Sequence, residues 1–465
     1  MKKFITWMLL AAMTASLAAC GGETPSADTT EAATTTAEPE VIYDMEGFTL
    51  NILKMPQKEI QWVLLSLGTN EETGEILNDT IVTRNRTLTE KHNFKIVETE
   101  LSNPAGVIRK MVSAGDDEYQ VLFSSIDASL LTGDQLIDAT GVDTLKLDAD
   151  CWDQNLLESL SIGDKTYLLG GDISVADEDC LEVLVYNTSF AKSLQLENLY
   201  EAVDAGTWTI DKMLSCMKLA ASDLNSDTKM DLEDSYGLIS NNDGVSAMLV
   251  SCGAAVIAKN EEDVPTLMAD SEHYAAAFAK LASVFDKSVW HSYDGVTPEM
   301  HVSCLENNRV LFINAVTSFA RRFLRDVKTD FGFLPTPKLD EAQERYYSAS
   351  VPSTCTLGIP ASCGDVENTG LALQLLAEGS GDLSHAYYEI CLQSKYTRDE
   401  ESYDMLRLST ENIYYDFGYF YTSQLGGLHN KLVTDLLKGG EGLSSIVAAS
   451  KEMTEQKIKE FYGLG

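Results

Sequence analysis

The order of apolar and polar positions predicts alternating strands and helices over the first part of the chain. Three short apolar runs are typical of strands, and the two segments between them have the character of helices. In chain order these elements are residues 49–53, 78–92, 94–97, 104–112 and 121–123. Such alternation indicates an α/β sheet, in which ligands sit at the carboxyl ends of strands. Ser124 and Asp127 follow the last run, so we expect them to contact a ligand, with a helix cap or turn as the alternative role.

A strand, a turn, a helix and a second strand are predicted far down the chain, within residues 308–347. The run 309–314 is β-branched and aromatic, Phe319 and Phe323 recur at helical spacing, and 330–334 ends at a pair of prolines. A unit of this kind indicates that the chain returns to a sheet begun much earlier. Proteins with two lobes and several crossings between them are built in this way.

The middle and the end of the chain are predicted to be mostly helical. Residues 181–187 form one more strand, which we take as the first crossing between lobes, and Thr209 is positioned to cap a helix that runs to 219. Further helices are expected at 272–290, 369–378, 384–396, 403–413 and 443–461. The aromatic face of the helix at 272–290 is more typical of a core than of a cofactor site.

The N-terminus has the pattern of a lipoprotein signal. Lys2 and Lys3 precede an apolar run to residue 17, and Leu-Ala-Ala-Cys ends at Cys20. We expect residues 1–19 to be removed, the Cys20 thiol to be diacylated, and 20–44 to be a flexible tether. An ordinary secretory signal is the alternative. No later segment is apolar for long enough to span a bilayer, so the lipid is the expected membrane attachment, on the extracellular face.

Charge and cysteine content exclude several classes of function. The 465-residue chain has a formal net charge of −38, which disfavours nucleic acid and anionic membrane surfaces as partners. Eight of the nine cysteines lie beyond Cys20, and they are dispersed without a CxxC pair, so neither a zinc site nor a redox motif is indicated. Buried free thiols are as consistent with this spacing as disulfides are.

One acidic segment, at 223–234, has the spacing of a calcium loop. Oxygen-bearing residues recur at alternate positions, and a carboxylate stands at the twelfth. The candidate ligands are Asp223, Asn225, Asp227, Lys229 (through its carbonyl), Asp231 and Asp234. Thr228 replaces the usual turn glycine and Asp234 is shorter than the usual Glu. A structural Ca²⁺ is therefore one hypothesis, and a solvated acidic turn is the other; no other cofactor is expected.

Catalytic motifs are absent from the sequence, whereas aromatic side chains suited to sugar binding are present. There is no GxSxG, HExxH or glycine-rich phosphate loop, and adjacent acids such as Asp177 and Glu178 are expected by chance among 72 acidic residues. An aromatic face covers the C–H face of a sugar ring, and Asp or Arg side chains bind its hydroxyls. Each aromatic residue taken singly is more often part of a core.

Several segments in the expected order resemble the extracellular solute-binding lipoproteins of ABC importers, of the family 1, carbohydrate-binding type. These are FGFLPTPK at 331–338 with Gln343 and Tyr346-Tyr347, Thr73-Gly74-Glu75 with Asn78-Asp79 and Arg84-Asn85, Trp152-Asp153, Val185-Tyr186-Asn187, and Gly206-Thr207-Trp208-Thr209. The resemblance covers residues 45–425. Cys151 stands where a second Trp is common, and Gln120 where Asp is common.

This resemblance implies a two-lobed α/β fold of the periplasmic-binding-protein type (type II), with hinge crossings and a ligand cleft between the lobes. We expect one lobe from 45–182 plus 305–357 and the other from 183–304 plus 358–465. The ligand-binding residues we expect are Ser124, Asp127, Trp152, Thr317, Phe319, Arg322, Asp416, Tyr419 and Tyr421. Tyr415 is a further candidate near the cleft.

The function that follows is that of a receptor without enzymatic activity. It would be a lipid-anchored monomer that captures a mono- or oligosaccharide between its lobes and delivers it to ABC permease subunits. Two alternatives stay open at this point. One is a surface glycan hydrolase with a carboxylate pair, and the other is a peptide-binding receptor of the same fold.

Overall fold

The computed structural model describes residues 41–293, 296–396 and 399–463 of the chain. The chain divides into Met1–Ile42 and a compact unit, Tyr43–Gly465. The predicted signal, Cys20 and the tether up to residue 40 lie outside the described residues.

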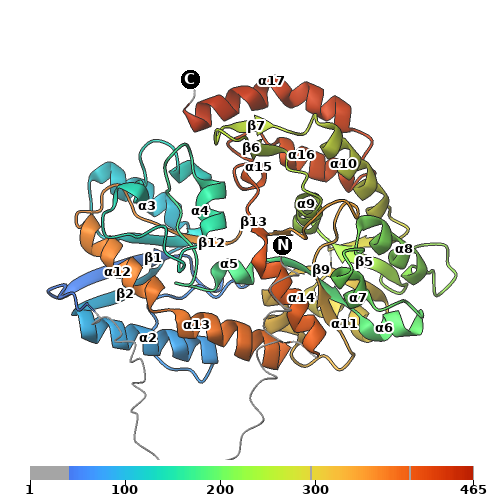
Figure 1. Ribbon diagram of the computed structural model, residues 1–465, viewed down its shortest axis with the longest axis horizontal. Helices are drawn as coiled ribbons and strands as arrows, with labels where there is room; N and C mark the ends of the chain where they lie inside the picture. Colours follow the sequence, from blue (N-terminus) through green and yellow to red (C-terminus); the bar gives the residue numbers. More distant parts are fainter. Residues whose placement is uncertain (1–40, 294–295, 397–398, 464–465) are drawn as a thin grey trace, which may run out of the picture. The chain divides into compact units, whose positions relative to one another are not determined.

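The first sheet has four strands in the order β12-β3-β1-β2. Strand β1 lies between two parallel neighbours, and β12 pairs antiparallel with β3. The strands are β1 (Phe48–Lys54), β2 (Phe94–Glu100), β3 (Val121–Ser125) and β12 (Cys355–Gly358). Helices α2 (Ile76–His92), α3 (Pro104–Ala114) and α12 (Val366–Glu378) pack on this sheet (Figure 1). The predicted strand and helix alternation of this region is confirmed.

The second sheet has five strands in the order β10-β4-β9-β5-β8. Its central strand β9 runs antiparallel to β4 and parallel to β5, so Glu182 lies opposite Val316. The strands are β4 (Glu182–Tyr186), β5 (Tyr236–Ser240), β8 (Trp290–Ser292), β9 (Val310–Val316) and β10 (Gly332–Leu334). Because β5, β8 and β9 are parallel, their carboxyl ends meet at one edge of the sheet. The candidate site lies at this edge.

Helices surround the second sheet, and their caps follow from the sequence. Thr209 accepts a hydrogen bond from the Lys212 N–H and so starts α8, as predicted. Trp208, just before it, is fully buried against Phe312 with ring centroids 5.6 Å apart, which is a packing role. The helices here are α6 (Thr188–Ser193), α7 (Leu199–Asp204), α8 (Ile210–Ala220), α9 (Asn242–Ser251), α10 (Glu272–Val284), α11 (Pro298–Glu306), α14 (Glu400–Glu411) and the π-helix η4 (Ala320–Leu324).

Shorter elements complete the described structure. Between β3 and β4 the chain forms η2 (Ala128–Leu130), η3 (Ala139–Gly141), α4 (Gln154–Leu160) and α5 (Ala176–Asp179). Two small sheets pair β6 (Ile257–Lys259) with β7 (Pro265–Leu267), and β11 (Ser348–Ala349) with β13 (Ile413–Tyr414). The last helices are α13 (Gly381–His385), the π-helix η5 (Ala386–Tyr396), α15 (Phe417–Phe420), α16 (Leu428–Leu436) and α17 (Leu443–Tyr462).

The predicted division into lobes is wrong in two places. We expected residues 305–357 to join the first sheet, but β9 and β10 lie in the second sheet. We also expected everything after 357 to join the second lobe, but β12 extends to Gly358 and α12 contacts β1 and α2 of the first sheet. The physical reason is that β9 is buried on both faces, so its apolar pattern identifies a strand without identifying its sheet.

Candidate functional site

A pocket of about 340 Å³ opens where β5, β8 and β9 end. This is the edge at which α/β proteins hold ligands, and the volume falls within the usual range for small-molecule sites. The walls come from the start of β4, from helices α9, α11 and η4, from loops that follow these strands, from a loop after β1 and from residues 351–353. The lining residues are Trp62, Glu182, Asn241, Asp243, Tyr293, Val296, Pro298, His301, Ala315, Val316, Phe319, Arg322, Phe323, Val351 and Ser353.

Two carboxyl groups line this pocket. Glu182, the first residue of β4, is 3% exposed, and its Oε2 accepts a 2.6 Å hydrogen bond from Asn314 Nδ2. Asp243 lies in the first turn of α9, and its Oδ1 accepts a hydrogen bond from the Tyr419 hydroxyl. Burial raises the pKa of both carboxyls, and the charge of Asp243 raises that of Glu182 further. The two groups are therefore close enough to interact, and each is harder to ionise than an exposed carboxyl.

Aromatic and imidazole rings form other walls of the same pocket. Tyr293 stacks on His301 with centroids 4.2 Å apart, and the guanidinium of Arg322 lies 4.6 Å from the centre of the Phe323 ring. Burial and the nearby charge of His291 lower the pKa of His301 to about 4, so its ring is neutral at physiological pH. Both ring nitrogens of His301 and Nε1 of Trp62 are buried without a hydrogen-bond partner among the described residues. Such groups are available to a ligand.

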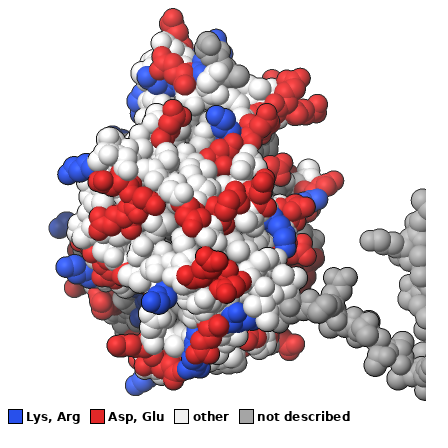
Figure 2. Space-filling view, turned by 90° about the vertical axis from the view of Figure 1, so that its left-hand side faces the viewer, with Lys and Arg blue, Asp and Glu red and all other residues white. Residues whose placement is uncertain are grey.

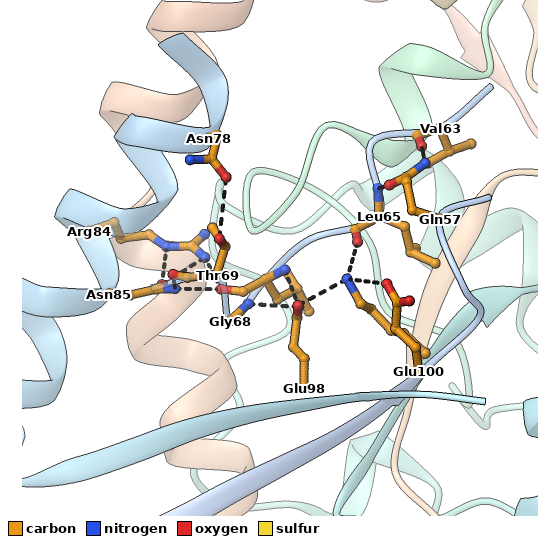
Figure 3. Close-up of polar contacts among 12 residues, drawn as sticks. Gln57, Val63, Leu65, Gly68, Thr69, Asn78, Arg84, Asn85, Glu98 and Glu100 are labelled. Atoms are coloured by element: carbon orange, nitrogen blue, oxygen red, sulfur yellow. Dashed lines mark hydrogen bonds and ion pairs between the residues drawn. The ribbon is translucent and has the colours of Figure 1, made fainter. Parts of the chain in front are cut away.

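Trp62 stands on a loop, residues 55–69, that buried polar contacts hold in place (Figure 3). Gln57 donates to the carbonyls of Ile60 and Val63 at 2.9 and 2.6 Å, and accepts from the Leu65 N–H at 3.0 Å. The Gln57 side chain thus bonds the backbone on both sides of Trp62 and holds this part of the loop in a compact turn. Lys54, at the end of β1, donates to the Leu65 carbonyl at 2.7 Å and so ties the loop to the first sheet.

The far end of this loop is clamped by β2 and α2 (Figure 3). Glu98 of β2 accepts from the Leu67 and Gly68 N–H groups. On α2, the buried Arg84 donates to the Leu67 carbonyl at 3.0 Å and to the Ile173 carbonyl at 2.7 Å, while Asn85 also bonds the Leu67 carbonyl, at 2.7 Å. The Arg84-Asn85 pair of the family-like segments thus positions the loop of Trp62 and does not reach the pocket.

A third connection joins the loop to η4. Asp179 of α5 is fully buried, accepts from the Leu64 N–H at 2.9 Å, and pairs with Arg321 at 2.6 Å. Leu64 is two residues from Trp62, and Arg321 precedes Arg322 in η4. One carboxylate therefore fixes the spacing between two walls of the pocket.

The structure brings two of the nine predicted ligand residues, Phe319 and Arg322, into this pocket. Tyr419 lies one layer behind, bonded to Asp243. Thr317 is 2% exposed and donates to the Glu178 carbonyl, and Asp416 is 1% exposed and caps α15.

The remaining four predicted residues, like Tyr419, Thr317 and Asp416, do not line this pocket. Trp152 is 1% exposed and donates to Gln374 Oε1 at 3.0 Å, and Tyr421 is fully buried and donates to the Leu160 carbonyl. Ser124 is 5% exposed within β3, and Asp127 caps η2, which is its alternative role. The further candidate, Tyr415, is also buried, and it bonds Asp153 at 2.6 Å.

Sequence reasoning missed Trp62, Glu182, Asp243 and Tyr293. One signal was available, because a Glu inside the otherwise apolar strand 181–187 is costly to bury and so indicates a special role. Asp243 and Tyr293 each lie just after a strand, β5 and β8. Both strands are short and were not predicted, so the positions of these two residues at strand ends were not apparent from the sequence. Trp62 lies in a loop with no distinguishing pattern.

The acidic loop at 223–234 turns its carboxylates toward its own backbone. Asp223 accepts from the Ser226 and Thr228 N–H groups at 2.6 and 2.9 Å, and Asp234 accepts from the Leu224 and Asp231 N–H groups at 2.9 Å each. The described residues contain no group of three or more His, Cys, Asp or Glu side chains that could hold a metal ion. This geometry does not support the calcium hypothesis, which stays a prediction to be tested.

A larger hollow, of about 740 Å³, lies along α8 away from this edge. Three of its charged side chains are in ion pairs, since Lys212 pairs with Glu197 and the neighbouring Lys280 pairs with Asp211. Its lining residues all belong to the described part of the chain, and none of them has a buried polar atom without a partner there. We therefore place the functional site in the smaller pocket, where such atoms occur.

Comparison with solved structures identifies the fold. No family model and no curated protein matches the chain. The GacH receptor of Streptomyces glaucescens, solved unliganded and with acarbose, aligns with a TM-score of 0.56 at 11% identity, over 89% of this chain and 99% of that chain. An ABC-transporter solute-binding protein from Thermotoga lettingae, bound to α-D-tagatose, aligns with a TM-score of 0.56 at 14% identity, over 89% and 100%.

A family 1 extracellular solute-binding protein from Bifidobacterium longum subsp. infantis gives a TM-score of 0.55 at 12% identity, over 90% of this chain and 100% of that chain. The chain therefore has the two-lobed, periplasmic-binding-protein-like α/β fold, as its sequence predicted. Within the described residues, no helix is both long and apolar enough to cross a membrane.

Proposed function

We propose that this protein is the extracellular substrate-binding receptor of an ABC importer and that it captures a carbohydrate. The observation that carries this proposal is the pocket at the strand ends, which combines aromatic rings with unpartnered polar atoms. Proteins of the same fold that bind acarbose and tagatose support it.

The two sides of the pocket give this receptor a mechanism. Trp62 comes from a loop tied to the first sheet, whereas Glu182, Tyr293 and Phe319 come from the second. A ligand that touches both sides favours the closed arrangement, because only that arrangement makes all of its contacts. A permease then recognises the closed form and receives the ligand.

The membrane attachment is a separate part of the proposal. It rests on the Leu-Ala-Ala-Cys sequence that ends at Cys20. Replacing Cys20 by Ser should move the protein from the membrane fraction of cells to the soluble fraction. Retention of the variant in the membrane fraction would overturn lipidation at this residue.

The test of the receptor function is a thermal-shift screen of the purified full-length protein against sugars, amino acids and peptides. A ligand at a hundredfold excess over its Kd should add about 2.7 kcal/mol to stability, a visible rise in Tm. A rise with sugars that Trp62→Ala weakens supports the proposal, and Trp152→Phe is the control, because Trp152 lies outside the pocket. A rise only with peptides would overturn the carbohydrate assignment.

A glycan hydrolase is the second candidate, because Glu182 and Asp243 are two carboxyls of raised pKa in one pocket. Glycosidases use such pairs as acid and nucleophile or base. Incubation with labelled oligosaccharides distinguishes the two functions. Shorter products that disappear with Glu182→Gln would establish the hydrolase, and intact oligosaccharide after binding would establish the receptor.

A further inference from the structure

The two pocket carboxyls have no cationic partner among the described residues. Glu182 bonds the neutral Asn314, and Asp243 bonds the neutral Tyr419. None of the ion pairs in the described part of the chain includes either acid. By contrast, the buried carboxylate of Asp179 is paired with Arg321. The pocket is thus a place where negative charge is left uncompensated.

The other charged or titratable groups of the pocket do not fill this role. Arg322 lies over the Phe323 ring, and the nearby groups that affect its pKa are Arg321, Asp179 and Glu299, which are not the pocket acids. His301 is neutral, and the Tyr293 hydroxyl donates to the Asn314 carbonyl. The compensating charge therefore has to come from a ligand or from protons.

We infer that the pocket takes an amino sugar, with its ammonium group held between Glu182 and Asp243. The inference rests on the proposed function and names its ligand class. An ammonium offers three N–H donors, and each carboxyl retains an oxygen beyond the one that its protein partner bonds. Aromatic rings beside the acids add cation–π attraction, so the same walls suit a sugar ring and a cation.

The net charge of the whole protein also favours a cationic ligand. The net charge of −38 attracts cationic solutes at long range, and acidic side chains outnumber basic ones on the face seen in Figure 2. Trp62 Nε1 is a donor for a hydroxyl oxygen, and the neutral His301 ring offers one donor and one acceptor. These groups complete the recognition of a polyol without adding positive charge.

Proton exchange distinguishes a cationic ligand from a neutral one. In the empty pocket the acids hold protons above their ordinary pKa, and an arriving ammonium ionises them, so each carboxyl that ionises releases one proton to the buffer. Affinity for an amino sugar should therefore rise with pH as long as its amine stays protonated. Affinity for a neutral sugar that accepts hydrogen bonds from the protonated acids should fall.

The experiment is isothermal titration calorimetry of the full-length protein with matched sugars. The probes are glucosamine and its β-1,4-linked oligomers, the N-acetylated and the 2-hydroxyl counterparts of each, and putrescine as an amine without a sugar ring. We expect the amino forms to bind at least tenfold more tightly than their neutral counterparts. Titration in buffers of different ionisation enthalpy should show proton release with the amino forms.

Variants test the assignment to the two acids. Glu182→Gln and Asp243→Asn should each weaken binding of the amino sugar at least tenfold and weaken binding of the neutral sugar by a smaller factor. Asp231→Asn, an exposed acid outside the pocket, is the matched control and should change neither. Unchanged Tm and circular dichroism show that the variants fold.

Each of the other possible results contradicts a specific part of the proposal. Neutral sugars that bind as tightly as amino sugars overturn this inference and leave the receptor function standing. Putrescine binding that depends on Glu182, with no sugar bound, supports a cation site and overturns the carbohydrate. No binding of any probe overturns this inference, and the wider thermal-shift screen then decides the receptor function.

Discussion

The carboxylates in two acidic regions of this protein differ in their hydrogen-bond partners and in the direction in which their pKa values are shifted. In the loop at 223–234 the acids accept hydrogen bonds from neighbouring N–H groups, and these bonds lower the pKa of Asp234. In the pocket, Glu182 and Asp243 each have one neutral partner, and burial raises their pKa values. The loop has the recognisable motif, but its acids are already satisfied. A binding site is therefore recognised by polar groups that lack a partner, and the spacing of residues in the sequence does not show which groups those are.

Replacement of Asp179, a buried acid with a full set of partners, should have the largest effect on stability. Asp179 bonds Leu64, Arg321 and Tyr387, so Asp179→Ala removes the buried carboxylate that pairs with the Arg321 guanidinium and frees the loop of Trp62. We expect a loss of about 3–5 kcal/mol in the free energy of unfolding, measured by urea denaturation. Asp177→Asn on the same helix is the control and should not destabilise, since one Asp177 oxygen has no partner among the described residues and burial raises its pKa to about 7. Equal losses in both variants would contradict the assignment.

Replacement of the pocket acids Glu182 and Asp243 should have the next largest effect on stability, and this effect should depend on pH. A raised folded-state pKa means that the folded protein binds protons that the unfolded chain has lost. Stability is then full below the ordinary pKa and falls as pH rises toward the folded value, by about 1.4 kcal/mol for each pH unit that separates the two pKa values. Glu182→Gln and Asp243→Asn remove this loss.

Unfolding of the ligand-free protein at pH 5 and pH 8 measures the effect. Each variant should match the wild type at the lower pH to within a small difference and exceed it at pH 8. The Asn314 hydrogen bond survives in Glu182→Gln, because the amide oxygen accepts it as the carboxylate did. Variants that are less stable than the wild type at pH 8 would show that these carboxylates are compensated after all.

The sequence predicted most of the local structure, because local structure depends on local patterns. The run 121–123 became β3, Pro104 became the first residue of α3, and Thr209 became a cap. The segment 308–347 formed its strand, helix and strand, yet both strands joined the other sheet. Pairing of β9 with β4 is a contact between residues more than a hundred positions apart, and no periodicity encodes it.

The site was predicted less well, because aromatic residues serve cores and ligands equally. Phe319 and Arg322 reach the pocket, but Trp152 is used to pack α12 through Gln374. Glu182 was visible as a charge in an apolar strand, whereas Trp62 depends on a loop fixed by Gln57 and by contacts from other elements. The side chains that define the pocket come together only through the pairing of the strands.

Within the acidic loop, the buried member should matter more than the exposed ones. Asp234 is 1% exposed, and its two oxygens each accept one N–H, so Asp234→Asn places an amide donor against a backbone donor. We expect a lower Tm at pH 7 and a smaller difference at acid pH, because a lowered pKa contributes stability that is lost as pH falls. Asp231→Asn, on the exposed side, should stay within about 0.5 kcal/mol of the wild type. A larger loss in Asp231→Asn would reverse this order.

Removal of metal ions should have the smallest effect on the Tm. The loop carboxylates already bond N–H groups, so a strong chelator should leave the Tm of the purified protein unchanged, and added Ca²⁺ should do the same. If Ca²⁺ instead raises the Tm and Asp223→Asn with Asp227→Asn abolishes the rise, the loop is a calcium site whose acids rearrange on binding. In that case both acidic regions would be binding sites, and they would differ in what satisfies them before the cation arrives: the loop's own backbone in one, and protons in the other.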